Sequence, residues 1–569
     1  MKRWLLFLIF LIPGCQHNQR QSFENLSAAF QQWYQKQQPV VATSFGLHEN
    51  DHLWPDISDT GHREYLADLK RFDLELVQID RRALNRYQRA DYEVLSNGIE
   101  QLIFQATDWQ PLTWDPGYVL EQIRNGIAFL VYTDLSPMTA RVSALMQRLD
   151  GLPDLLESAR TQLDNPTIPH LERAHRLNEE LRRLLLDVPL QINADDLTLD
   201  HIDVLLTTAT ATLKEYDAWL EDEVSERKTR SHRMGETLFV RQLQHMLNED
   251  ISFSQIKEQV NSTYLAIQDR MLRLALPLYL QENDEPVWVD RDDTLDVIDW
   301  VLADIEHSQR PVMGDSRYFS EVKTLLEEYI LAGEPLFPPS RLDLVWGDDP
   351  LTPLPATPFV LGGCGLFEEQ YRMMIQFELP QFSTGWVTVP HVNLGLTNSA
   401  MRQAWLGWIY PGITELNLAT AKQVSPLRVF FANPGFSSAW RHYVVEFLLA
   451  DGLEGGDVHS EIRQLLDILQ LSLAAVVDLE VHTGDLEWNS ARDFLQQQGF
   501  VDEEQAGAKW EKAVFSPGLA TAALVEYNLL WNLHRLNRRQ TGDQWRALNF
   551  HNRILDNGIL PVRLIHSFL

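Results

Sequence analysis

Two acid and imidazole pairs in the C-terminal third are the residues best suited to metal-assisted chemistry. His442 precedes Glu446, and Asp478 precedes His482, by four residues, the spacing that places two side chains on one face of a helix. A catalytic zinc needs about three such donors and an open position for water. Two donors at this spacing are common by chance, so ion pairs and satisfied polar core groups are the alternative interpretation. Further candidate donors are Glu415 and His391.

Other motifs with a chemical mechanism are incomplete. No H-E-x-x-H occurs among the 17 histidines, so the commonest zinc helix is absent. The glycines of 362–365 lack the dinucleotide spacing, and Leu295 replaces the glycine that a calcium loop at 290–293 requires. The segment 435–439 lacks the second glycine of a nucleophile elbow. We therefore expect no cofactor and no metal ligand set of a standard kind.

The N-terminus has the layout of a bacterial lipoprotein signal. Lys2 and Arg3 precede an apolar run from Trp4 to Pro13, and Gly14 precedes Cys15. The run of about ten residues is too short to cross a bilayer. No other apolar stretch is long enough to form a transmembrane helix. An uncleaved buried helix is the alternative. We expect a signal peptide over 1–14, lipidation of Cys15 and a short tether over 15–25, with outer-membrane sorting favoured because Gln16 is not aspartate.

Composition excludes several classes of protein. The chain has 569 residues, of which 45% are hydrophobic and 10% aromatic, so it can bury a large core and is neither disordered nor collagen-like. The formal net charge of −32 disfavours nucleic acid as a partner. Two cysteines, Cys15 and Cys364, are too few for a disulfide framework or a four-cysteine zinc site.

Helical periodicity dominates residues 26–341. Leu145, Leu149, Leu152 and Leu156 recur on one helical face, with an interruption expected at Pro153. Between 342 and 398 proline, glycine and short apolar runs predict a small β element. Helical patterning returns over 399–569. The sequence thus predicts a mainly α fold with one small inserted sheet, and 26–569 as one integrated domain.

Several motifs resemble the bacterial proteins grouped as domain of unknown function 885, a mainly helical family regarded as zinc-metallopeptidase-like. Residues 550–561 are similar to its terminal F-H-x-x-x-L-x-x-G-x-x-P pattern, and residues 39–46 to its P-x-x-A-T-x-x-G segment. Residues 91–95 resemble its D-Y-x-x-L helix. Asp478 with His482 resembles its D-x-x-x-H helix, and residues 517–518 its P-G pair.

The residues that carry the family's chemistry are missing. The resemblance implies an H-E-x-x-P-G-H-H helix, but alignment on Pro411 and Gly412 places non-ligating residues at its donor positions. A later V-E-G-W-A-L-Y-x-E helix should supply carboxylates and does not. We call the degenerate positions the relic positions: Gly407, Trp408, Ile413, Thr414, Arg441 and Leu448. An arginine among them would repel a dication.

The resemblance and its losses together predict a function without catalysis. We expect a metallopeptidase-like envelope lipoprotein, anchored in a membrane through Cys15, that binds a peptide or an envelope protein partner through the relic cleft. The alternative is a hydrolase that uses relocated donors, for which His442, Glu446, Asp478 and His482 are the candidates. Trp405, Trp408, Tyr410, Ile413 and Leu416 are expected either to fill the core or to line an apolar groove.

Overall fold

The fold is mainly α, as the periodicity predicts. The computed structural model describes residues 12–132, 136–192, 196–283, 291–308, 329, 335–339, 402–403, 406–408, 410–423 and 425–569. No strand occurs within these ranges. The β element expected over 342–398 lies outside them, as do His391, Trp405 and Cys364.

The N-terminal helices are α1 (Ile12–Gln37), α2 (Pro39–Ser44), α3 (Asp59–Val77) and α4 (Arg86–Phe104). Helices α1 and α3 run antiparallel, because Trp33 bonds Asp68 while Phe30 packs on Phe72. The side chain of Ser58 accepts the Gly61 N–H at the start of α3. Residues 15–25, expected as a tether, lie wholly within α1, where Phe23 is buried.

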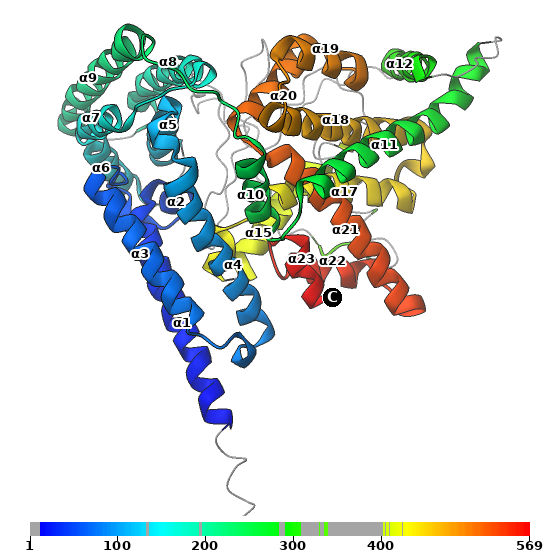
Figure 1. The fold of residues 1–569 in the computed structure, drawn as a ribbon, viewed down its shortest axis with the longest axis horizontal. Coiled ribbons are helices and arrows are strands. Elements are labelled where there is room, and N and C mark those ends of the chain that lie inside the picture. The colour runs from blue at the N-terminus through cyan, green and yellow to red at the C-terminus, as the bar shows by residue number, and fades with distance from the viewer. Residues whose placement is uncertain are drawn as a thin grey trace, which may run out of the picture.

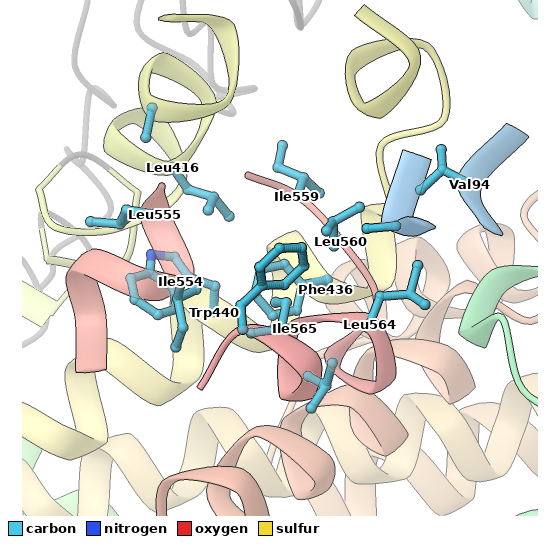
Figure 2. Packing of buried hydrophobic residues seen from close by; sticks show 14 of the residues in the cluster. Val94, Leu416, Phe436, Trp440, Ile554, Leu555, Ile559, Leu560, Leu564 and Ile565 are labelled. Atoms are coloured by element: carbon cyan, nitrogen blue, oxygen red, sulfur yellow. The ribbon is translucent and has the colours of Figure 1, made fainter. Parts of the chain in front are cut away.

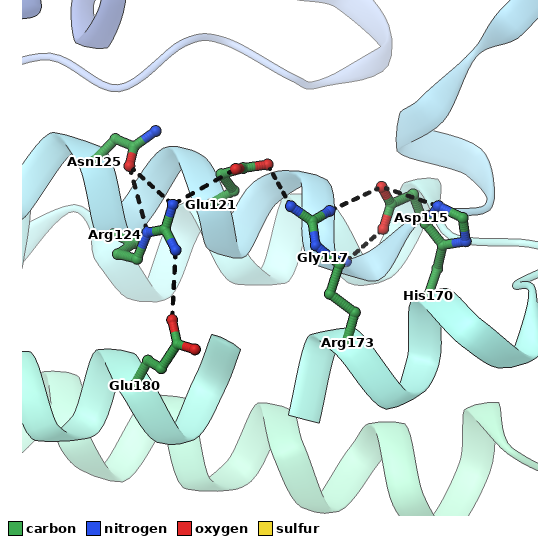
Figure 3. Close-up of polar contacts among 8 residues, drawn as sticks. All are labelled: Asp115, Gly117, Glu121, Arg124, Asn125, His170, Arg173 and Glu180. Carbon is green, nitrogen blue, oxygen red and sulfur yellow. Dashed lines mark hydrogen bonds and ion pairs between the residues drawn. The ribbon is translucent and has the colours of Figure 1, made fainter. Parts of the chain in front are cut away.

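A second group of helices lies at the upper left of Figure 1. It comprises α5 (Pro116–Tyr132), α6 (Met138–Asp150), α7 (Leu152–Gln162), α8 (Ile168–Gln191) and α9 (Asp196–Trp219). The break between α6 and α7 falls at Gly151, directly before the leucine and Pro153 that open α7, so the interruption predicted there is confirmed. Asp115 accepts the Gly117 N–H at the start of α5 and lies 3.8 Å from Arg173 of α8 (Figure 3).

A third group packs around the long helix α18 (Val458–Thr483). It comprises α10 (Glu236–Leu247), α11 (Phe253–Glu282), α19 (Trp488–Gly499), α20 (Glu503–Phe515) and α21 (Leu519–Thr541), and α12 (Arg291–Ser308) joins the group by packing on α11. Asp502 and Gln505 form a reciprocal capping box at the start of α20. These helices share one buried apolar cluster.

The relic positions lie in the part of the fold that joins the two ends of the chain. Here α15 (Ile413–Gln423), α16 (Pro426–Phe430), α17 (Pro434–Asp451), α22 (Ala547–Leu555) and α23 (Val562–Ile565) share a core with α1, α3 and α4. Figure 2 shows Phe436 and Trp440 of α17 among Ile554, Leu560 and Val94. Helix α17 is therefore fixed on several sides before any ligand is considered.

No single described helix is long and apolar enough to cross a membrane. One bent pair, α20 with residues 519–544, meets the length and composition criteria jointly, with an angle of 94° between its halves.

Candidate functional site

The turn before α15 rests on α17 through close backbone contact. Trp440 Nε1 donates to the carbonyl oxygen of Pro411 at 2.9 Å. A Cβ atom on Gly412 would lie 2.0 Å from the carbonyl oxygen of Gly407, so only glycine fits there. This contact brings the first relic positions against α17.

Three relic positions meet at this junction. The guanidinium of Arg441 lies 4.9 Å from the ring centre of Trp408, a cation–π distance. A Cβ atom on Gly407 would lie 2.7 Å from Cγ of Arg441. The arginine stem therefore occupies the space that a side chain at position 407 would need.

The remaining relic positions are not gathered into a ligand set. Leu448 is fully buried in the apolar core, and Ile413 is half-buried at the start of α15. The side chain of Thr414 lies outside the described part of the structure. Tyr410 and Leu416 are buried, so these two residues fill the core, which was one of the two expectations for them. Trp408 is half-buried beside Arg441.

A group of cations surrounds the junction. Arg441 Nη2 donates to Nε2 of His442 at 3.3 Å and lies 3.9 Å from the carboxylate of Asp467. Burial, followed by the charges of Arg441, Lys509 and Lys512, holds the pKa of His442 well below its usual value. Burial lowers the pKa of Lys509 to about 8. The charges of Arg441 and Lys512 act in the same direction, and Asp467 opposes them. The junction therefore has an excess of positive charge and a neutral imidazole.

These residues do not fit a zinc ion. Gly407, Trp408 and Leu448 carry no lone-pair donor for a metal, and the Nε2 lone pair of His442 accepts a hydrogen bond from a cation. A dication placed here would be repelled by Arg441.

The candidate residues for a relocated site have structural partners instead. Glu446 accepts hydrogen bonds from Arg270 and from the hydroxyl of Tyr527. A cavity of about 50 Å³ beside Glu446 and Glu461 has room for little more than water. Within the described ranges, no group of three or more His, Cys, Asp and Glu residues is arranged to hold a metal ion.

The second pair is also occupied. Asp478 accepts from the Gly518 N–H at 2.9 Å and from the N–H and hydroxyl of Thr521 at 3.1 and 2.8 Å, which fixes the start of α21 on α18. Burial raises the pKa of Asp478 to about 7. His482 Nε2 donates to the carbonyl oxygen of Ala513 at 2.8 Å, and burial lowers its pKa to about 4. Asp478 and His482 thus connect α18 with α21 and α20 through these hydrogen bonds.

Glu415 is fully buried on α15 and is the remaining described candidate donor. Sequence reasoning missed the lysines at 509 and 512, because they lie on α20, far along the chain from the relic positions. Charge alone could not have selected them among 48 lysines and arginines.

A larger groove lies away from the relic positions. It has a volume of about 570 Å³ and lies between α4 and α10, with Glu100, Arg241, His245 and Arg563 among its lining residues. Nε2 of His245 is buried and has no hydrogen-bond partner among the residues that the structure describes, while Oδ1 of Asn97 lies 3.2 Å from its Nδ1.

The comparison with known families decides the classification. Bacterial proteins of unknown function (DUF885) match residues 39–323 and 411–568, which is most of the chain. The chain belongs to the DUF885 family. The resemblance inferred from the motifs is thus confirmed. Gly407 and Trp408 fall outside the matched ranges, whereas Arg441 and Leu448 fall inside them.

Two solved structures share the DUF885 fold seen here. One, from Shewanella oneidensis, is classed provisionally as a lipoprotein of unknown function; its TM-score is 0.77 at 18% identity over 96% of this chain and 98% of its own. The other, from Colwellia psychrerythraea, is also classed provisionally as a lipoprotein; its TM-score is 0.73 at 13% identity over 97% and 98%. No curated protein sequence matches the chain. At these identities the likeness establishes the fold.

Proposed function

We propose that this DUF885 protein is a non-catalytic envelope lipoprotein, anchored through Cys15, that keeps a peptidase-like scaffold and binds an acidic ligand at the relic positions. One observation carries the proposal: the stem of Arg441 fills the space beside Gly407, and its guanidinium covers Trp408. A cation thus stands at a position where the family resemblance implies a carboxylate. The lipoprotein-like N-terminus and the provisional class of the two neighbours support the anchor.

The ligand chemistry follows from the charges at the junction. Arg441 is a quarter exposed, and Lys509 is half-buried, so both are within reach of a molecule in solution. A guanidinium and an ammonium together suit a carboxylate, and the face of Trp408 suits an apolar neighbour of that carboxylate. The C-terminus of a peptide, or an acidic side chain of an envelope protein, combines these features.

Metal content and peptidase activity test the absence of catalysis. We expect far less than one zinc per purified chain and no peptide hydrolysis that EDTA abolishes. Stoichiometric zinc with EDTA-sensitive turnover would contradict the proposal. If hydrolysis is found, His442→Ala, Glu446→Ala and His482→Ala should each abolish it under the alternative of relocated donors. Glu461→Ala is the matched control, because Glu461 also pairs with Arg270.

Calorimetric titration with short peptides tests the ligand. A peptide with a free C-terminal carboxylate should bind at least roughly ten-fold more tightly than its amide, because a charge-assisted hydrogen bond contributes about 1.5–3 kcal/mol. Arg441→Gln should remove the difference. Lys257→Gln, which changes an exposed lysine paired with Glu480, is the control. Equal binding of acid and amide would exclude carboxylate recognition at this place.

A further inference from the structure

The start of α1 lies beside the connection between α3 and α4. The N–H of Asp80 donates to Gln19 Oε1 at 2.9 Å, and Arg20 Nε donates to the carbonyl oxygen of Ala83 at 3.0 Å. Figure 1 shows the first turns of α1 extending beyond this connection at the lower end of the molecule. Cys15 precedes Arg20 by five residues of the same helix, which is about 7.5 Å along its axis. The proposed lipid anchor is thus within about one Debye length of the connection.

This end of the molecule carries arginines without acidic partners. Arg20, Arg82, Arg86 and Arg89 are exposed, and none forms an ion pair within the described part of the chain. Arg81 pairs with Glu93 at 2.7 Å. The other carboxylates nearby in the sequence are Glu24, Asp73, Glu75, Asp80 and Asp91, of which Glu75 pairs with Arg71 and Asp91 with Arg428. Residues 81–90 contain four arginines and no acidic residue, although the formal net charge of the chain is −32.

Exposed apolar side chains lie on the two helices that this connection joins. Leu74 and Val77 are 67% and 65% exposed near the end of α3, and Tyr87 is 54% exposed at the start of α4. Arg86 lies 5.4 Å from the ring centre of Tyr87. Single exposed apolar residues are ordinary, but arginine, tyrosine and aliphatic side chains together are the composition of a membrane–water interface.

We infer that this basal surface, formed by Leu74, Val77, Arg82, Arg86, Tyr87 and Arg89, rests on the headgroups of an anionic phospholipid bilayer beside the anchor. The arginines bind lipid phosphates, and the apolar side chains enter the headgroup boundary. The inference rests on the proposed lipidation of Cys15, which brings this end of the chain to the membrane. Contact there would orient the molecule with α5–α9 away from the bilayer, as the arrangement in Figure 1 indicates.

A fluorescent probe on the basal surface tests the contact. The mature lipidated protein is prepared as Cys364→Ala with Val77→Cys, and an environment-sensitive dye is attached to the new thiol. The matched control is Val204→Cys on α9, where the valine is 64% exposed. Both are mixed with vesicles of phosphatidylcholine alone or with added phosphatidylglycerol, and flotation and emission are measured.

We expect both proteins to float with both vesicles. Emission of the Val77→Cys probe should shift to shorter wavelength on the phosphatidylglycerol vesicles, and that of the Val204→Cys probe should not shift. The triple variant Arg82→Gln, Arg86→Gln and Arg89→Gln should lose the shift. Arg176→Gln, Arg183→Gln and Arg273→Gln change the net charge equally on exposed helix faces elsewhere and should keep it.

The outcomes separate the contact from the anchor. Flotation with both vesicles without a shift at position 77, or with an equal shift at position 204, overturns the basal contact and leaves the anchor standing. Flotation with phosphatidylglycerol vesicles alone, lost in the triple variant, supports the contact and contradicts lipidation. Flotation with neither vesicle contradicts both.

Discussion

Gly407 is the residue at which the relic positions are most sensitive to change, because any side chain there would meet the stem of Arg441. Gly407→Ala should destabilise the protein by about 1–3 kcal/mol through overpacking. In an Arg441→Ala background the same change should cost less, and denaturant midpoints of the four proteins give the coupling.

Gly507→Ala is the control for helix propensity. Gly507 lies inside α20, and its nearest side-chain contact for an added Cβ is 3.8 Å, so alanine there should stabilise by up to about 1 kcal/mol. If Gly407→Ala costs the same with and without Arg441, the two residues are not in contact.

Asp115 is the buried carboxyl whose pH dependence is most accessible to experiment. Burial raises its pKa to about 7, against the opposing charge of Arg173, in the cluster drawn in Figure 3. The folded state therefore holds a proton that the unfolded state releases near pH 4. The stability that this proton contributes is present in full below that pH and is lost as pH rises through about 7.

Asp115→Asn removes this titration while keeping an acceptor for the Gly117 N–H. The free energy of unfolding of the unmodified protein, relative to that of the variant, should fall by on the order of 1–3 kcal/mol between about pH 5 and pH 8. Denaturant titrations of both proteins at the two pH values measure this difference in the free energy of unfolding. Asp543→Asn, which changes an exposed carboxyl, is the control. If the stability of Asp115→Asn depends on pH in the same way as that of the unmodified protein, Asp115 does not have the raised pKa.

The family motifs that survive in this chain connect helices. Asp91 of α4 accepts from Arg428 Nε at 2.6 Å, and Arg428 Nη1 donates to the carbonyl oxygen of Asn557 at 2.9 Å. Two of the family-like motifs, 91–95 and 550–561, are thus joined through an arginine of α16. His551 of the second motif bonds the hydroxyl of Tyr443 at 2.9 Å. In the sequence these motifs indicate the family. In the structure their residues form hydrogen bonds that hold helices together.

Arg428→Met should destabilise the protein by about 3–5 kcal/mol, because it leaves the carboxylate of Asp91 largely buried without its partner. The double variant Arg428→Met with Asp91→Leu should recover part of the loss. Arg71→Met, which removes an exposed arginine bonded to Asp68 and Glu75, should cost at most about 1 kcal/mol. Thermal and denaturant unfolding of the variants measure these differences, and equal losses for Arg428→Met and Arg71→Met would contradict the joint.

Local signals predicted the helices, whereas long-range contacts determined the site. The break before Pro153 follows from proline chemistry and was readable from the sequence. The convergence of Arg441 with Gly407 and Trp408 depends on how α17 packs, and no local pattern encodes it. The i, i+4 pairs were visible, but their partners, Arg270, Tyr527 and Thr521, lie more than forty residues away along the chain.

At the scale of the molecule, the cores show how far apart in sequence the packing partners are. One buried cluster contains Phe23 and Phe30 together with Phe436 and Phe568, so the two ends of the chain stabilise one another. Helices α5–α9 form a separate cluster from sequence-local residues. Periodicity identifies which faces are buried, but the choice of partner for each face depends on tertiary packing that composition does not specify.

Membrane attachment concerns the whole molecule, and we propose that it depends on Cys15. Cys15→Ser removes the proposed site of lipidation, where each buried acyl methylene would contribute about 0.8 kcal/mol to anchoring. We expect the variant to lose lipid labelling and to lack lipoprotein processing, which radiolabelled fatty acid and the gel mobility of the product measure. The unmodified chain should be recovered in the membrane fraction even at high salt, because acyl chains are insensitive to ionic strength while the basal arginines are not. Cys364→Ser is the control for loss of a thiol. If Cys15→Ser took up label and was processed as the unmodified chain is, the N-terminus would not be a lipoprotein signal.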